Sequence, residues 1–216
     1  MFPAKSILKR LLIFIVSYLL LMGLFQVPGL RNTSADLFSK GADRFVSVFL
    51  PKGYIHMRKV EEETTESQHL VQVMFGNRER VDEQMEAARK SGQVKTALDL
   101  LQFKIKLVEF YLMGLFFFLA LLVITPVNWK RKLIGAGWGI ILFLLFAFLK
   151  LLCYTLYYYT QFPMGVYELS GFPLKFVTAV FEYVKMGVNI LLATLIWVFA
   201  VFRHSDWRNI LGRMGY

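Results

Sequence analysis

The chain has 216 residues, of which 56% are hydrophobic and 19% charged, with a formal net charge of +10. A soluble domain has about 45–50% apolar and about 25% charged residues, so the composition argues against an ordinary soluble domain. The basic residues stand beside long apolar runs, and the charge therefore does not predict nucleic-acid binding.

The first apolar stretch, 11–27, is long enough to cross a hydrocarbon core of about 30 Å at about 1.5 Å per residue. Lys5, Lys9 and Arg10 precede it, as in a signal peptide. The run exceeds the roughly 7–15 apolar residues of a signal-peptide core, which favours a retained membrane anchor.

An amphipathic helix is expected next, over 34–50, where Phe38, Ala42 and Val46 recur at helical spacing. We expect it to lie on the outer membrane surface. Pro51 and Gly53 end it.

The following pattern predicts a β-hairpin with strands at 54–60 and 68–75 around a polar loop. Apolar faces match if Met57 lies opposite Val71, and a shift of two residues fits equally well. A helix over 79–90 and a strand over 101–107, which alternates apolar and polar residues, complete the segment.

Three more apolar stretches follow, at 108–127, 133–159 and 176–202. The predicted fold is an α-helical membrane protein with four transmembrane helices and a small α+β extracytoplasmic module between helices one and two. A short surface-lying helix over 206–214 is expected at the end of the chain.

Basic residues define the topology. Nine of them flank the apolar stretches at both ends of the chain and in the 128–132 loop: Lys5, Lys9, Arg10, Lys130, Arg131, Lys132, Arg203, Arg208 and Arg213. By the positive-inside rule these three segments face the cytoplasm. The segment 31–106 holds thirteen basic and eleven acidic residues, and this near balance predicts that it faces the other side.

The expected organisation is a cytoplasmic N-terminus with the first transmembrane helix (1–30), the extracytoplasmic module (31–107), transmembrane helices two to four (108–202) and a cytoplasmic amphipathic tail (203–216). Eukaryotic four-span proteins of the claudin type share this layout but depend on a cysteine pair, and Cys153 is the only cysteine here. A bacterial plasma (inner) membrane is therefore the expected location.

Candidate chemistry is sparse. The topology separates Cys153 from His204 by most of the bilayer, which excludes a thiol and histidine pair. His56 and His69 have no acidic or cysteine partner at ligand spacing, and the acids of 61–66 lack the glycine that organises a calcium loop. No catalytic, cofactor or metal site is predicted.

Five charged residues lie in or beside the outer halves of the apolar stretches: Lys106, Glu109, Lys150, Glu182 and Lys185. A charge in hydrocarbon costs about 2.5–3.5 kcal/mol even on insertion scales, so their placement needs a reason. One interpretation is anchoring at the interface, where lysines extend to water. The other is an interaction cluster at which a partner helix or peptide docks.

The run 119–132, Leu-Ala-Leu-Leu-Val-Ile-Thr-Pro-Val-Asn-Trp-Lys-Arg-Lys, ends the second apolar stretch. It resembles the Thr-Pro, Trp and basic ending of small four-span membrane proteins that accompany exosortases, which are bacterial membrane protein-sorting enzymes. The order of anchor, outer helix, strands and three clustered spans is similar too. This resemblance implies an accessory protein at a sorting or surface-assembly site, without a catalytic role.

Two other classes stay open. The membrane subunit of an ABC-type mechanotransmission complex has the same order of spans but needs a cytoplasmic coupling helix, for which 128–132 is short. A small transporter or lipid-handling protein needs polar residues at mid-membrane, where the chain offers Ser17, Asn189 and Thr194. The expected partners are the lipid bilayer and another membrane protein, and the sequence leaves the oligomeric state open.

Overall fold

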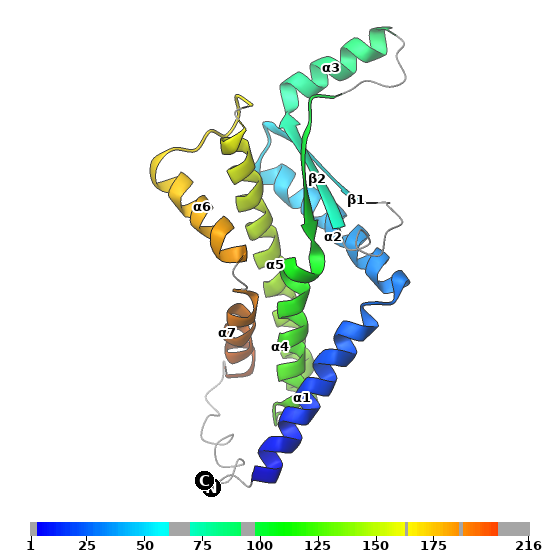
Figure 1. Ribbon diagram of the computed structural model, residues 1–216, viewed down its shortest axis with the longest axis vertical. Coiled ribbons are helices and arrows are strands. Elements are labelled where there is room, and N and C mark those ends of the chain that lie inside the picture. Colours follow the sequence, from blue (N-terminus) through cyan, green and yellow to red (C-terminus); the bar gives the residue numbers. More distant parts are fainter. Residues whose placement is uncertain (1–3, 61–69, 92–97, 163, 186–187, 203–216) are drawn as a thin grey trace. The chain divides into compact units, whose positions relative to one another are not determined.

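A computed structural model describes residues 4–60, 70–91, 98–162, 164–185 and 188–202 (Figure 1). The chain forms two compact units. The first comprises Met1–Leu30, Val108–Ala147 and Gly187–Tyr216, and the second Arg31–Leu107 and Phe148–Met186. One long helix, α5 (Trp129–Gln161), contributes residues to both units.

The first unit is helical. It contains α1 (Ala4–Leu24), a π-helical turn (Val108–Leu112), α4 (Met113–Ile124), the first part of α5, and α7 (Asn189–Phe202). The ring of Phe14 on α1 meets that of Phe117 on α4 edge-on at 5.2 Å between centroids. The core joins α4, α5 and α7 through five buried residues: Phe118, Leu122, Phe143, Ala193 and Ile196.

Two helices in the described part of the chain, α1 and α5, are long and apolar enough to cross a membrane. Val108–Ile124 and Asn189–Ala200 are apolar but shorter. The expectation of one helix over 176–202 is wrong, because α6 (Gly171–Lys185) ends at Lys185 and α7 begins at Asn189. Val188, immediately before α7, lies in a turn.

Most of α2 (Pro28–Phe49) belongs to the second unit. This helix confirms the one expected over 34–50 and starts six residues earlier. Proline is favoured in the first helical turn because its missing N–H has no intrahelical partner there. Phe38 is buried, and its ring lies 5.6 Å from that of Phe148 on α5. The face of α2 that carries Phe38, Ala42 and Val46 therefore packs against protein, and the location of this helix on the membrane surface stays a prediction.

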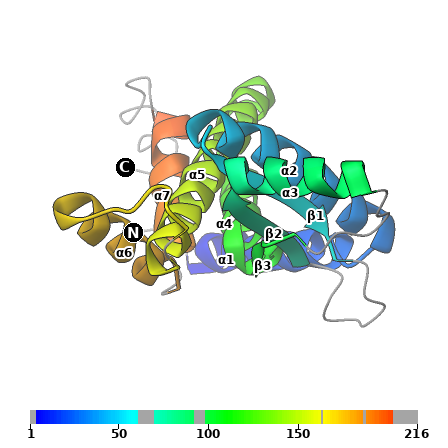
Figure 2. The same cartoon turned by 90° about the horizontal axis from the view of Figure 1, so that it is seen from above.

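A three-stranded antiparallel sheet follows, with β1 (Gly53–Lys59), β2 (Leu70–Asn77) and β3 (Leu101–Lys106) in that order (Figure 2). The strands confirm those expected from alternation. Met57 lies opposite Val73, so the register is the one shifted by two residues. Pairing of β2 with β3 places Val73 opposite Phe103.

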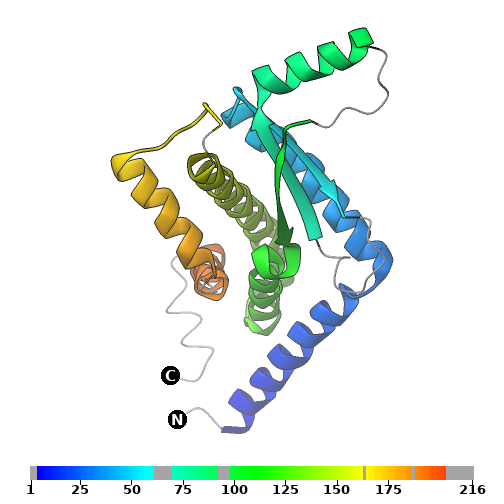
Figure 3. The same cartoon turned by 45° about the horizontal axis from the view of Figure 1, so that its top comes forward.

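The helix α3 (Arg78–Ser91) confirms the one expected over 79–90. It projects beyond the end of the strands (Figure 3), and Val81 is its buried residue. The tail helix expected over 206–214 and the hairpin tip lie outside the described residues.

Candidate interaction site on the open sheet face

One face of the sheet is apolar and covered by protein. The ring of Phe103 on β3 stacks on that of Tyr158 at 4.4 Å, and Phe75 on β2 meets Tyr159 edge-on at 5.2 Å. Both tyrosines belong to the last turns of α5. Because side chains alternate along a strand, the residues between these apolar positions must point to the opposite face.

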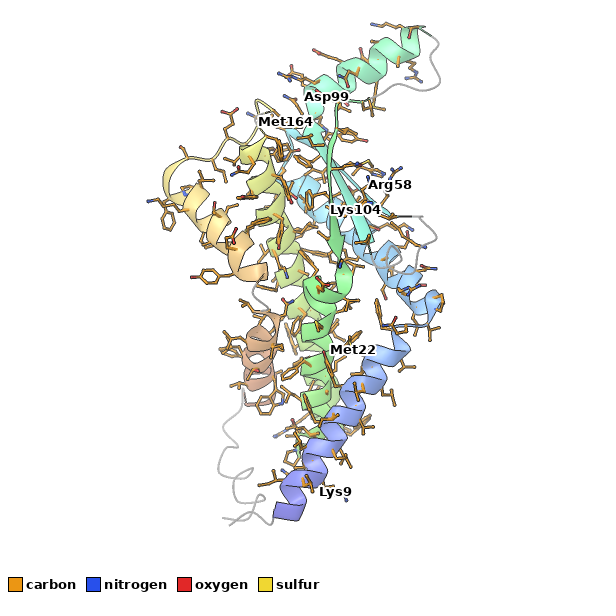
Figure 4. The ribbon with its side chains drawn as sticks, viewed as in Figure 1. Lys9, Met22, Arg58, Asp99, Lys104 and Met164 are labelled. Atoms are coloured by element: carbon orange, nitrogen blue, oxygen red, sulfur yellow. The ribbon has the colours of Figure 1, made fainter. Side chains whose placement is uncertain are left out.

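That opposite face is polar and largely exposed, and we call it the open sheet face. It carries a row in which Arg58, Gln72 and Lys104 lie opposite one another, and a neighbouring row in which Met74 lies between His56 and Gln102. Lys106 follows at the end of β3. Figure 4 labels Arg58 on β1 and Lys104 on β3.

Hydrogen bonds order this face. The Nε atom of Arg58 donates to Oε1 of Gln72 at 3.2 Å, and Nε2 of Gln72 donates to Oε1 of Gln102. Gln72 is only 7% exposed although it lies at the centre of a polar face, because its neighbours cover it. This relay of amides fixes the orientation of the Arg58 guanidinium relative to the strands.

The charged residues that the three strands themselves contribute to the open sheet face are all basic. Arg58, Lys104 and Lys106 are exposed, and the sequences of the three strands contain no acidic residue. Lys104 and Lys106 are about 7 Å apart along β3, and Arg58 is about 10 Å from Lys104 across two strand spacings. Three cations thus lie within reach of one extended ligand.

The sequence contains part of the signal for this face. Alternation in the hairpin places His56, Arg58 and Gln72 on the side opposite Ile55, Met57 and Val73, and the lysines of 101–107 alternate with apolar residues. The pairing of β3 with β2, which brings Lys104 beside Gln72, was the missing step.

A second polar feature is a cleft of about 610 Å³ beside α3. Its lining includes four carboxylates at helical spacing, two cations and a loop: Glu79, Asp82, Glu83, Glu86, Lys52, Arg78, Asn77, Gly165 and Val166. Among the described residues no group of three or more His, Cys, Asp or Glu side chains is arranged to hold a metal ion.

The structure places the five residues of the sequence-derived cluster in different settings. Lys106 is exposed at the end of β3, Glu109 is exposed in the π-helical turn, and Glu182 is exposed on α6. Lys150 on α5 is 2% exposed, so its side chain does not extend to water as expected. Lys185 is the last residue of α6, and its side chain lies outside the described part.

Glu109 belongs to the first compact unit, whereas Lys106, Lys150, Glu182 and Lys185 belong to the second. The common docking role of the five stays a prediction. Of the other candidates, Cys153 is half-buried in α5, and His69 and His204 fall outside the described residues.

The motif that carries the resemblance forms the connection between α4 and α5. The hydroxyl of Thr125 donates to the carbonyl of Leu121 at 2.7 Å and accepts the indole N–H of Trp197 at 2.9 Å. Lys132 donates through Nζ to the carbonyl of Val123 at 2.6 Å. These bonds satisfy carbonyls at the end of α4 and tie the turn to α7, so the motif has a structural role in this chain.

Asp43 on α2 contacts the edge of the sheet. Its carboxylate accepts a hydrogen bond from the backbone N–H of Met57 and lies near the imidazole of His56. Its Oδ1 atom is buried without a hydrogen-bond partner among the described residues. Burial raises the pKa of this carboxyl group, and the two neighbours oppose that rise.

Replacing Asp43 by asparagine is expected to leave stability unchanged or raise it at pH 7. The amide keeps an oxygen for the Met57 N–H and removes a partly buried charge. The pKa of this carboxyl group is higher in the folded than in the unfolded protein. Its favourable contribution to the free energy of unfolding is therefore complete below the unfolded pKa of about 3.9 and is lost as pH rises through the folded pKa. The wild type should therefore lose stability relative to Asp43→Asn as pH rises from about 4.

Thermal unfolding of both proteins between about pH 3.5 and pH 7 measures this difference. Asp36→Asn on the exposed side of α2 is the control, because it removes a carboxylate whose exposed ion pair with Lys40 is worth about 0.2–1 kcal/mol at most. A lower melting temperature for Asp43→Asn than for the wild type at pH 7 would contradict the account.

Comparison with protein-family models, with curated proteins and with solved structures found no match to this chain.

Proposed function

We propose that this chain is a polytopic accessory protein of a bacterial plasma membrane, which presents its α+β module outside the cytoplasm to a membrane-embedded sorting or surface-assembly enzyme or to its exported substrate. The observation that carries the proposal is the open sheet face, a cationic surface on which hydrogen bonds order the side chains of Arg58, Gln72 and Gln102. Such a surface suits binding better than chemistry.

Exposed apolar side chains support the membrane part of the proposal. None of the 18-residue apolar window Ile7–Leu24 in α1 is buried, and its exposed residues include Leu8, Leu12 and Leu19. A monomeric soluble protein rarely exposes contiguous apolar patches larger than a few hundred Å². A lipid environment removes the free-energy cost of exposing apolar side chains to water, both for α1 and for the exposed apolar side of α5.

The proposed topology has four crossings, made by α1, by the π-helical turn with α4, by α5 and by the region of α7, with both chain ends in the cytoplasm. The basic residues 130–132 in the first turn of α5 support this orientation. With 14 residues, α7 covers about 21 Å, so the fourth crossing needs flanking residues as well.

The partner class rests on the resemblance carried by 119–132. An ABC-type mechanotransmission subunit is disfavoured, because α4 ends at Ile124 and α5 begins at Trp129, which leaves no room for a coupling helix between them.

Affinity purification from native membranes in mild detergent tests the proposal. We expect the wild type to recover a sorting enzyme or an exported substrate protein, and the double variant Arg58→Glu with Lys104→Glu to recover at least about tenfold less. The matched control is Arg80→Glu with Arg89→Glu on exposed positions of α3, which changes the net charge equally.

Equal recovery with the wild type, the sheet variant and the α3 control would contradict a role for the open sheet face. Recovery of an ATPase in place of a sorting or assembly protein would contradict the proposed class.

A further inference from the structure

We propose that the open sheet face binds an extended, acidic segment of another polypeptide chain. This inference rests on the proposed function and names the chemistry of the partner. It follows from three properties of the face, which are its charge, the spacing of its cations and the hydrogen bonds that hold Arg58.

The charge selects an acidic ligand. Arg58, Lys104 and Lys106 project from strands that contain no acidic residue, and all three are exposed. Complementary potential is what steers partners to such a surface and discriminates against like-charged ones. A basic segment is therefore excluded as the ligand of this face.

The spacing selects an extended ligand. Lys104 and Lys106 stand two residues apart on one strand, about 7 Å, and an extended polypeptide repeats its side chains on one side with the same period. A segment with acids at alternate positions can meet both lysines in register. A third acid reaches Arg58, which lies two strands across the sheet from Lys104.

The hydrogen bonds favour a polypeptide over a lipid headgroup. The Arg58 side chain is oriented through its Nε bond to Gln72, which leaves the planar end of the guanidinium to take a carboxylate in two parallel hydrogen bonds. Gln102 is exposed two residues before Lys104 on β3, and its amide nitrogen offers a donor that the carbonyl of a peptide backbone can accept. A headgroup phosphate would use the cations but has no need of the ordered amides.

The test uses the full chain in nanodiscs of phosphatidylcholine and a fluorescein-labelled peptide of about twelve residues in which Glu and Thr alternate. Fluorescence anisotropy should report saturable binding that weakens as salt rises from about 50 to 500 mM. The corresponding Lys and Thr peptide should not bind. A peptide of the same composition with its Glu residues in one block should bind several-fold more weakly, because its acids do not follow the repeat of the strand.

Variants locate the site. Arg58→Gln, Lys104→Gln and Lys106→Gln together should weaken binding of the alternating peptide by about tenfold or more. The triple variant Arg80→Gln, Arg89→Gln and Lys90→Gln on α3, which removes the same charge, should bind as the wild type does. The neutral Gln substitutions lie on exposed positions, so the sheet itself should remain folded.

Three results would overturn the inference. They are equal affinity for the alternating peptide and the Lys peptide, equal loss with the α3 variant, and binding to vesicles containing phosphatidylglycerol without binding to the peptide. The last result would assign the face to lipid headgroups.

The two proposals can fail separately. Peptide binding with no sorting or assembly partner in native membranes would refute the proposed function alone, whereas a recovered partner without peptide binding would refute only the inference.

Discussion

Replacing Gly139 by alanine is expected to lower the free energy of unfolding of the helical unit by about 1–3 kcal/mol. A Cβ atom at this position of α5 would overlap the ring of Phe118 on α4. Phe118 is fully buried, and its ring lies 5.8 Å from that of Phe143, so it has little room to move. The helices must separate or the ring must leave its preferred rotamer.

Gly137 is the matched control, because it lies two residues earlier in α5 and a Cβ there would meet nothing within 4 Å. Gly137→Ala should be neutral or stabilising by up to about 1 kcal/mol, since alanine loses less backbone entropy in a helix. Thermal unfolding in mild detergent, followed by tryptophan fluorescence, compares the two variants. A Gly139→Ala protein as stable as Gly137→Ala would contradict the packing of α4 against α5.

Replacing Tyr159 by phenylalanine is expected to destabilise the unit that contains the sheet by about 1–3 kcal/mol. The Tyr159 hydroxyl donates to the carbonyl of Gly76 at 2.9 Å and lies 3.3 Å from the carbonyl of Tyr54. Tyr54 and Gly76 face each other across β1 and β2. One side chain of α5 therefore holds the end of the strand pair, and it is 0% exposed.

Gly53→Ala should disturb the same contact. A Cβ at Gly53 would lie 2.5 Å from the Tyr159 hydroxyl oxygen, so the tyrosine would have to shift. With Phe at position 159 that oxygen is absent, and the double variant should therefore lose less stability than the sum of the single variants.

The control for the tyrosine is Tyr157→Phe. Its ring stacks on that of Phe181 at 4.2 Å, and within the described residues its hydroxyl makes no hydrogen bond. It should change stability by no more than about 0.5 kcal/mol. A loss for Tyr157→Phe equal to that for Tyr159→Phe would show that a general aromatic effect, and not the bond to Gly76, holds the strand pair.

Local structure in the module was predictable because its signals are short-range. Pro51 and Gly53 end α2, the alternation in 101–107 gives β3, and β1 and β2 begin and end within two residues of the expected limits. The register needed structure, because Ile55 and Met57 present the same apolar face after a shift of two.

Long-range packing was not predictable from the same patterns. The stretch 176–202 is mostly apolar, and its hydropathy alone does not report that α6 ends and α7 begins within it. The aromatic end of α5 is typical of a membrane interface, yet Tyr158 and Tyr159 cover the sheet. Glycines stand at alternate positions 135, 137 and 139 of the sequence, and only at Gly139 would a Cβ atom overlap an aromatic ring.

The candidate site was predictable in part. The free-energy cost of placing a charge in hydrocarbon identified Lys106 as a candidate from the sequence, and this lysine belongs to the open sheet face. Arg58 and Lys104 are cations on ordinary exposed strand positions, so only the strand order that sets them on either side of Gln72 identifies them as one surface.

Site-specific labelling with a membrane-impermeant maleimide tests the central claim most directly, since Cys153 is the only native cysteine and Cys153→Ser gives a silent background. In that background Glu83→Cys on exposed α3 should react in intact spheroplasts. Lys9→Cys and Lys130→Cys, on exposed positions of α1 and α5, should react only after the membrane is permeabilised. Protection of position 83 or reaction of position 9 or 130 in intact spheroplasts would contradict a membrane accessory protein with its module outside.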